Sequence, residues 1–188
     1  TDHERIDALA AQYQDQAIDV LINNAGVSGG YDNQVFGEIN YEAFNKAIAV
    51  NTYAPIKLAE TFLPMIQASE QKKIVAISSN LASITNSFGE VYIYRVSKAA
   101  LNMAYRSMAK DLVDDGMIVT LLTPDPTRTD FAAAAKGASY LKKVPKRPGG
   151  ITVRTAQESV TDMIRTIDSL TLQDSGTFKG YGGKAIPW

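Results

Sequence analysis

The sequence runs KIVAISSNLASITNSFGEVYIYRVSK from residue 73 to residue 98, and this segment says most about the architecture. Its beginning, Lys73 to Ser79, is a short apolar run that predicts a buried strand. A polar loop extends to Val91, and the apolar spacing from about Tyr94 to Val113 then predicts a helix. A strand that is apolar without alternation is typical of a parallel sheet covered on both faces.

The same alternation of strands and helices continues on both sides of this segment. No repeat, linker or second domain interrupts it, so the sequence predicts a single α/β domain over residues 1–188. The other predicted elements are an N-terminal helix carrying Ile6, Leu9, Ala10 and Tyr13, the strand Ile18–Ile22, the helix Tyr41–Ala68 with an interruption at Pro55, the strand Met117–Leu122, the helix Thr155–Leu170 and a short strand after Gly176.

One segment is longer than the loops of compact domains usually are. Residues Asp130–Gly150 combine basic side chains with Ala and Gly and show no regular pattern. Such a segment is either a lid over a site or a solvated surface loop, and both interpretations stay open.

Composition excludes several kinds of protein. Nineteen Lys and Arg against twenty Asp and Glu give a net charge of -1, which leaves no basic excess for nucleic acid. No window approaches the ~18 consecutive apolar residues of a membrane span. With no cysteine and with His3 as the only histidine, we expect no disulfide, no thiolate chemistry and no metal site, and the composition fits the cytoplasm. Any catalysis must use Ser, Tyr, Lys, Asn or carboxylates.

Tyr94 and Lys98 are four residues apart, which places a phenol and an ammonium on one face of a helix. Tyr53 and Lys57 have the same spacing, so the pattern alone is weak. We prefer the first pair because a buried strand ending at Ser79 precedes it, and open α/β sheets bind ligands at the carboxyl ends of their strands.

These groups suit the transfer of hydride to a carbonyl. A phenol titrates at about pH 10, but a nearby ammonium and a bound cationic nicotinamide both favour the phenolate. Tyr94 then becomes a usable acid and base, while Ser79 donates a hydrogen bond to the carbonyl oxygen. No histidine, cysteine or metal is required.

Pro55 has no N–H with which to bond the carbonyl of Asn51, four residues earlier. The freed carbonyl predicts a kink that can hold a water linking Lys98 to solvent as a proton relay. The alternative is an ordinary proline kink with a solvated Asn51, and it stays open.

Four motifs that occur in order resemble the short-chain dehydrogenase/reductase family. They are Asn23-Asn24-Ala25-Gly26 after a strand, Asn51 in a helix, Ser79 after a strand, and Tyr94 with Lys98 on the next helix. The C-terminal part, from Pro124 through Gly176 to Trp188, is similar to the C-factor-like branch of that family. The resemblance covers essentially the whole chain and implies a Rossmann-like, doubly wound parallel sheet.

The resemblance also implies a function. It is that of an oxidoreductase that moves hydride between NAD or NADP and a small carbonyl or alcohol substrate. Tyr94 would be the general acid/base, Lys98 would lower its pKa and bind the nicotinamide ribose, and Ser79 would orient the carbonyl. Asn51 would hold the relay water. The further cofactor contacts would be Asn24, Ala25 and Gly26 on the adenosine side and Pro124, Thr127 and Thr129 beside the carboxamide.

The chain departs from the family pattern at three points. Ser79 stands fifteen residues before Tyr94, farther than usual, so Ser83, at eleven, is a rival for the polarising role. Asp125 follows Pro124 where the family commonly has glycine, which puts a carboxylate near the cofactor. No Gly-x-x-x-Gly-x-Gly turn, which binds the pyrophosphate, precedes the first strand.

Without that turn and its strand, Ile18–Ile22 is expected to be an exposed apolar edge. We therefore hypothesise that residues 1–188 belong to a longer enzyme of roughly 250 residues. Two functions stay open, namely the reductase and a non-catalytic signalling or interaction protein derived from one. The family implies a homodimer or homotetramer, formed by helices whose apolar residues extend beyond one core face. These residues are Phe62, Met65, Leu101, Met103 and Met108.

Overall fold

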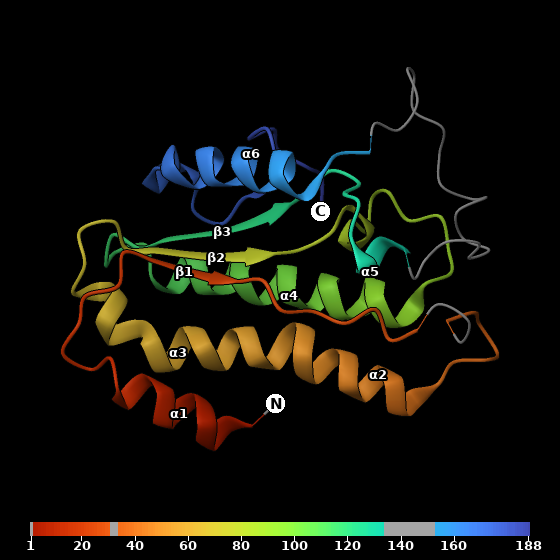
Figure 1. Ribbon diagram of the computed structural model, residues 1–188, viewed down its shortest axis with the longest axis horizontal. Helices are drawn as coiled ribbons and strands as arrows, with labels where there is room; N and C mark the ends of the chain where they lie inside the picture. Colours follow the sequence, from red (N-terminus) through yellow and green to blue (C-terminus); the bar gives the residue numbers. More distant parts are fainter. Residues whose placement is uncertain (1, 31–33, 134–152) are drawn as a thin grey trace.

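The computed structural model describes residues 2–30, 34–133 and 153–188, and its centre is a parallel sheet (Figure 1). The described strands lie in the order β1-β2-β3-β4, and all their pairings are parallel. Their bounds are β1 Val20–Asn23, β2 Lys73–Ile77, β3 Ile118–Thr123 and β4 Phe178–Gly180. The predicted α/β class and parallel sheet are therefore confirmed.

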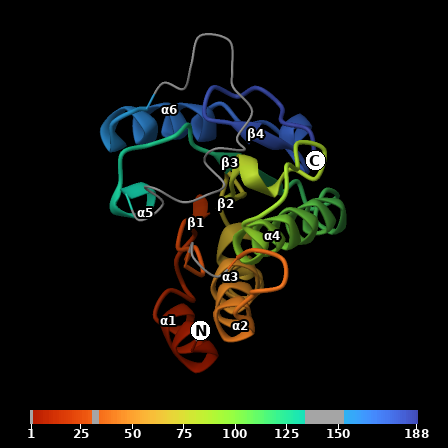
Figure 2. The same ribbon diagram turned by 90° about the vertical axis from the view of Figure 1, so that its right-hand side faces the viewer.

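Helices cover both faces of this sheet. Figures 1 and 2 show α3 and α4 on one face and α6 on the other, which is the doubly wound arrangement. The α-helices are α1 His3–Ala11, α2 Tyr41–Ile48, α3 Ala54–Gln67, α4 Tyr92–Asp111, α5 Asp130–Ala133 and α6 Ala156–Asp168. The shorter turns are the π-helical η1 Ala49–Tyr53 and the 3-10 helices η2 Asn80–Ala82 and η4 Leu172–Asp174.

The core has two parts, because side chains on a strand alternate between the two faces of the sheet. Ile74 and Ala76 of β2 lie in the larger cluster under α3 and α4, whereas Val75 lies in the smaller cluster under α6. All three are fully buried. This two-sided burial explains why the strand reads as a continuous apolar run.

The interruption predicted at Pro55 takes the form of a π-helical turn. Asn40 caps α2, η1 follows α2 directly, and Pro55 stands in the first turn of α3, where its missing N–H is tolerated. The helical rod continues through the junction in Figure 1. The turn buries Asn51 completely, so the alternative of a solvated asparagine is wrong.

The strand β1 lies at one edge of the described sheet, as expected for this apolar segment. Its Ile22 side chain is 45% exposed. The preceding helix α1 packs on α3, where Asp7 pairs with Lys57 at 2.6 Å. One side of β1 is thus left open to solvent.

Some sequence predictions require correction. Phe62, Met65 and Leu101 belong to the buried core and cannot extend beyond it, whereas Met103 is 63% exposed. The short helix α5 starts the segment that was predicted to be irregular. Most of Asp130–Gly150 lies outside the described residues, and with it the choice between lid and surface loop.

Candidate active site

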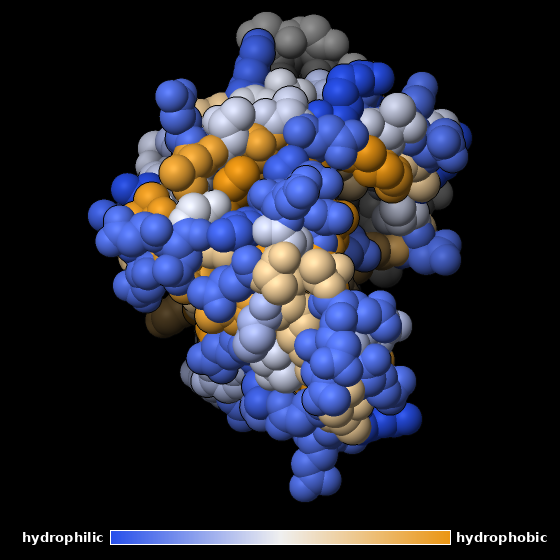
Figure 3. Space-filling model, turned by 90° about the vertical axis from the view of Figure 1, so that its left-hand side faces the viewer, coloured by the Kyte–Doolittle hydropathy of each residue, from blue (hydrophilic) through white to orange (hydrophobic). Residues whose placement is uncertain are grey.

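The predicted site residues gather at the carboxyl ends of the strands, the end that faces the viewer in Figure 2. Asn24–Gly26 follow β1, Ser79 follows β2 and Pro124 follows β3. The opposite end, shown in Figure 3, is covered largely by hydrophilic residues, with apolar side chains between the layers. Within the described residues, no group of three or more His, Cys, Asp or Glu could hold a metal ion, and no helix is long and apolar enough to cross a membrane.

Lys98 is a buried ammonium at the centre of this end. Its side chain is 4% exposed, and Nζ donates a hydrogen bond of 2.8 Å to the carbonyl oxygen of Ile77, the last residue of β2. Loss of water around the charged form lowers the pKa of Lys98 to about 8. The ammonium therefore titrates near pH 8 rather than near its ordinary 10.5.

Gly26 brings the backbone after β1 directly against this ammonium. A Cβ atom at position 26 would lie 3.3 Å from Asn51 Oδ1, closer than side chains normally approach, and 3.4 Å from Lys98 Nζ, in van der Waals contact. The absence of a side chain thus leaves the main chain beside the two polar groups. Gly26, Asn51 and Lys98, which lie far apart in the sequence, meet here.

The side-chain amide of Asn51 forms hydrogen bonds through both its oxygen and its nitrogen. Its Oδ1 accepts from the N–H of Val27 and its Nδ2 donates to the Val27 carbonyl, both at 2.8 Å. Nδ2 also donates to Ser97 Oγ at 2.8 Å. Asn51 therefore fixes the loop after β1 to the face of α4 that carries Lys98. The predicted relay water would bind the main-chain carbonyl, and this part of the hypothesis stays a prediction.

Tyr94 lies in the first turn of α4 and is 8% exposed, with its ring centroid 5.6 Å from that of Phe131. Its backbone N–H is held by Gln34, whose Oε1 accepts it at 3.0 Å. Gln34 is 1% exposed, and its Nε2 donates to the carbonyls of Ser28 and Gly30. Sequence reasoning missed Gln34 because nothing in a polar loop indicates a partner sixty residues away.

The structure separates the two candidate serines. Ser79 is half-buried and its Oγ accepts from the N–H of Leu81 at 3.2 Å, while no described residue accepts its hydroxyl proton. Ser83 is buried, and its Oγ donates to the carbonyl of Trp188 at 3.4 Å and accepts from the N–H of Asn86 at 3.2 Å. This arrangement favours Ser79, because the hydroxyl of Ser83 is already engaged by Trp188 and Asn86.

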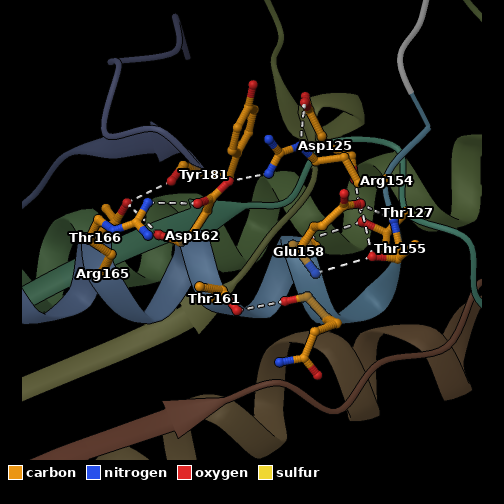
Figure 4. A network of polar contacts seen from close by, with 12 residues as sticks. Asp125, Thr127, Arg154, Thr155, Glu158, Thr161, Asp162, Arg165, Thr166 and Tyr181 are labelled. Atoms are coloured by element: carbon orange, nitrogen blue, oxygen red, sulfur yellow. Dashed lines mark hydrogen bonds and ion pairs between the residues drawn. The ribbon is translucent and has the colours of Figure 1, made fainter.

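The segment after β3 is fastened to α6 by the polar network of Figure 4. Thr127 Oγ1 hydrogen-bonds the carbonyl of Asp125 at 2.7 Å and Ser159 Oγ at 3.1 Å. The guanidinium of Arg154 stacks 4.7 Å from the ring centroid of Tyr181 and lies 3.9 Å from the Asp125 carboxylate. A hydrogen bond to Asp125 raises the pKa of Tyr181.

This network bears on the departure noted at Asp125. The carboxylate of Asp125 lies near the guanidinium of Arg154 and is hydrogen-bonded by the phenol of Tyr181, so its negative charge is balanced locally. Arg154 also pairs with Asp162 of α6. Of the other residues predicted to border the cofactor, Asn24, Ala25 and Thr129 are exposed and Pro124 is half-buried.

Comparison with known proteins identifies the family. A family model described as short chain dehydrogenase matches residues 1–138. The chain belongs to the short-chain dehydrogenase family. It is 34% identical to C-signal of Myxococcus xanthus, covering 91% of this chain and 93% of that protein, which supports the C-factor-like branch. It is 30% identical to 1-hydroxy-2-glutathionyl-2-methyl-3-butene dehydrogenase of a Rhodococcus strain, covering all of this chain and 77% of the relative.

A solved structure supports the same assignment for this dehydrogenase-family chain. The NADPH-bound carbonyl reductase from chicken fatty liver matches with a TM-score of 0.81 and 28% identity. The match covers the whole of this chain and 74% of the reductase. The predicted Rossmann-like fold is therefore confirmed, and the chain is a member of an oxidoreductase family.

Proposed function

We propose that this chain transfers hydride between a nicotinamide cofactor, NAD or NADP, and a small carbonyl or alcohol substrate. The observation that carries the proposal is the meeting of Gly26, Asn51 and Lys98 one helical turn from Tyr94. A buried ammonium with a lowered pKa, one helical turn from a buried phenol, suits acid/base chemistry at that phenol.

The residues at this end of the sheet fit a nicotinamide cofactor. The backbone at Gly26 lies against the ammonium of Lys98 with no side chain between them, so a ribose hydroxyl can approach both. Asn24 and Ala25 are exposed on the same turn, and Pro124, Thr127 and Thr129 follow β3, which β2 separates from β1. The cofactor, when bound, supplies or accepts the hydride. The carbonyl reductase to which this chain is similar is described with NADPH bound.

The protein groups then have separate tasks. In reduction, the Tyr94 hydroxyl gives its proton to the developing alkoxide, and in oxidation the phenolate takes it back. The positive charge of Lys98 would favour the phenolate form of Tyr94. The hydroxyl of Ser79, whose proton no described residue accepts, donates a hydrogen bond to the carbonyl oxygen of the substrate. Asn51 keeps the turn after β1 in place through Val27.

The test combines binding with turnover. Titration with NADH and NADPH measures cofactor affinity, and a panel of small ketones and aldehydes measures reduction. Tyr94→Phe retains the ring packed on Phe131, so it is expected to bind cofactor as the wild type does while losing turnover by at least a hundredfold. Turnover by this variant at the wild-type rate would refute the role of Tyr94.

A second candidate function is that of a signalling or interaction protein. The observation in its favour is the 34% identity to C-signal over 93% of that protein. This candidate predicts that the purified chain binds neither NADH nor NADPH. Saturable binding of either cofactor together with Tyr94-dependent turnover would exclude the purely non-catalytic version.

We also propose a homodimer or homotetramer in the cytoplasm. The exposed apolar surface that supports this assembly is smaller than the sequence indicated, because Met103 is the one exposed residue of the predicted apolar set. A groove of about 270 Å³ between α3 and α4, lined partly by Ile56 and Leu63, lies on the same helix pair. Light scattering measures the mass in solution, and Met103→Glu is expected to shift it toward the monomer.

A further inference from the structure

A second groove lies beside the active-site helix, between η2 with the loop that follows it and the first turns of α4. Its volume is about 230 Å³, and most of its described lining is apolar. Ile84 and Val96 stand on it as exposed apolar side chains. Leu81 and Ala99 contribute further apolar surface, and Arg95 contributes a cation. None of the proposed catalytic residues lines this groove.

Arg95 is the unusual member of this lining. The residue is only 8% exposed, and its guanidinium lies 4.6 Å from the ring centroid of Phe88. One guanidinium nitrogen, Nη1, is buried and has no hydrogen-bond partner among the described residues. Burial lowers the pKa of Arg95, which shows that the surroundings disfavour the charged form. A buried guanidinium nitrogen without a hydrogen-bond acceptor is costly, and a carboxylate oxygen placed in the groove would offset that cost.

The backbone beside the same groove is strained. Gly89, Glu90 and Val91 all have positive φ angles, of 87°, 55° and 55°. This conformation is natural for glycine but unfavourable for a β-branched residue such as valine. Strain of this kind collects where a protein holds a ligand or a switch. The three residues lie within six positions of Arg95, whose Nη1 has no described hydrogen-bond partner.

We propose that this groove binds a small amphiphilic carboxylate, with the carboxylate on Arg95 and the apolar tail along Leu81, Ile84 and Val96. Arg is suited to this task because its planar guanidinium matches a carboxylate. The volume is below the ~300–1,000 Å³ of sites for drug-sized ligands, so a short-chain acid fits better than a long one. Consecutive helical residues point about 100° apart, so Arg95 and Tyr94 serve different sites on α4.

The test measures binding directly and needs no enzymatic activity. Hexanoate is titrated into the chain and followed by calorimetry, and hexan-1-ol and hexylammonium of the same length serve as controls. We expect saturable binding of hexanoate, at least tenfold tighter than binding of either control. Binding of hexan-1-ol with equal affinity would overturn the role of the cation. Inorganic phosphate, which has no apolar tail, is titrated as a further control, and its binding with equal affinity would overturn the role of the tail.

Variants sharpen this test. Arg95→Met removes the charge but keeps a long apolar side chain, and it is expected to weaken hexanoate binding at least tenfold. Arg106→Met, on the same helix but outside the groove, is the matched control and should bind hexanoate as the wild type does.

A further variant covers the case in which Arg95→Met does not fold. Val96→Asp changes an exposed position on the groove and places a negative charge against the ligand, so a tenfold loss of hexanoate affinity is expected. Unchanged hexanoate binding in folded Arg95→Met or in Val96→Asp overturns the proposal. Self-association through this groove in the absence of any hexanoate binding does so as well.

Discussion

Burial of Lys98 makes the stability of the fold depend on pH. The pKa of this ammonium falls from its ordinary 10.5 to about 8 in the folded chain. Between these two values the unfolded chain holds a proton that the folded chain has released, so the free energy of unfolding rises with pH through this window. At about 1.4 kcal/mol per unit, the shift corresponds to about 3 kcal/mol, of which roughly 2 to 3 kcal/mol falls between pH 7 and pH 10.

Urea unfolding of the wild type and of Lys98→Met at pH 7, 8, 9 and 10 tests this reasoning. The variant also removes the donor to the Ile77 carbonyl, but that loss is the same at every pH. The stability of the wild type relative to the variant should therefore rise by roughly 2 to 3 kcal/mol across the range. Lys110→Met, at an exposed position of the same helix, controls for the loss of one lysine. A difference that stays constant, or that falls as pH rises, would refute the desolvation argument.

Three further substitutions test the packing around the site. Gly26→Ala inserts a methyl group 3.3 Å from Asn51 Oδ1 and is expected to cost about 1 kcal/mol of stability by urea unfolding and to weaken NADPH binding severalfold. Unaltered NADPH affinity would argue against this turn as a cofactor contact. Gln34→Ala removes the acceptor of the Tyr94 N–H and the donor to the carbonyls of Ser28 and Gly30. The free energy of unfolding is expected to fall by roughly 2 to 3 kcal/mol, with faster hydrogen exchange at the Tyr94 amide. Tyr105→Phe removes a buried hydroxyl that accepts a hydrogen bond of 2.7 Å from the side-chain amide of Asn23, the last residue of β1. Thermal unfolding should show a loss of stability of about 1 to 2 kcal/mol.

The strands and the order of the layers could be predicted because burial on both sheet faces leaves a direct trace in the sequence. The predicted strand Met117–Leu122 appears as Ile118–Thr123, and Lys73–Ser79 as Lys73–Ile77. The helix predicted at about Thr155–Leu170 is α6, Ala156–Asp168. Apolar runs and turn residues carry this information locally, so the predicted bounds differ from the observed ones by only a few residues.

The faces of the helices were harder to predict. Phe62 and Leu101 seemed free for an interface, yet both are buried, because α3 and α4 pack on each other as well as on the sheet. A helix with neighbours on two sides carries apolar residues on more than one stripe. The pattern alone therefore does not distinguish core from interface.

The polar contacts of the site could not be predicted from the sequence, because they join segments that are distant along the chain. Spacing brought Tyr94 and Lys98 onto one helix, but nothing local indicates that Asn51 binds the backbone of Val27. Nor does a polar loop show that Gln34 would hold the start of α4. Such bonds depend on the folded topology, which residue spacing does not contain.

The buried cations of the described residues differ in how well the fold satisfies them. Lys73 is as buried as Lys98, but its ammonium donates to two carbonyls, of Ile167 and Asp168, at the C-terminal end of α6, where the helix dipole favours a cation. Lys98 donates to one carbonyl, and Nη1 of Arg95 has no described partner. Because a buried donor without an acceptor lowers stability, the retention of Nη1 of Arg95 in this state argues that it awaits a ligand group that the fold itself does not supply.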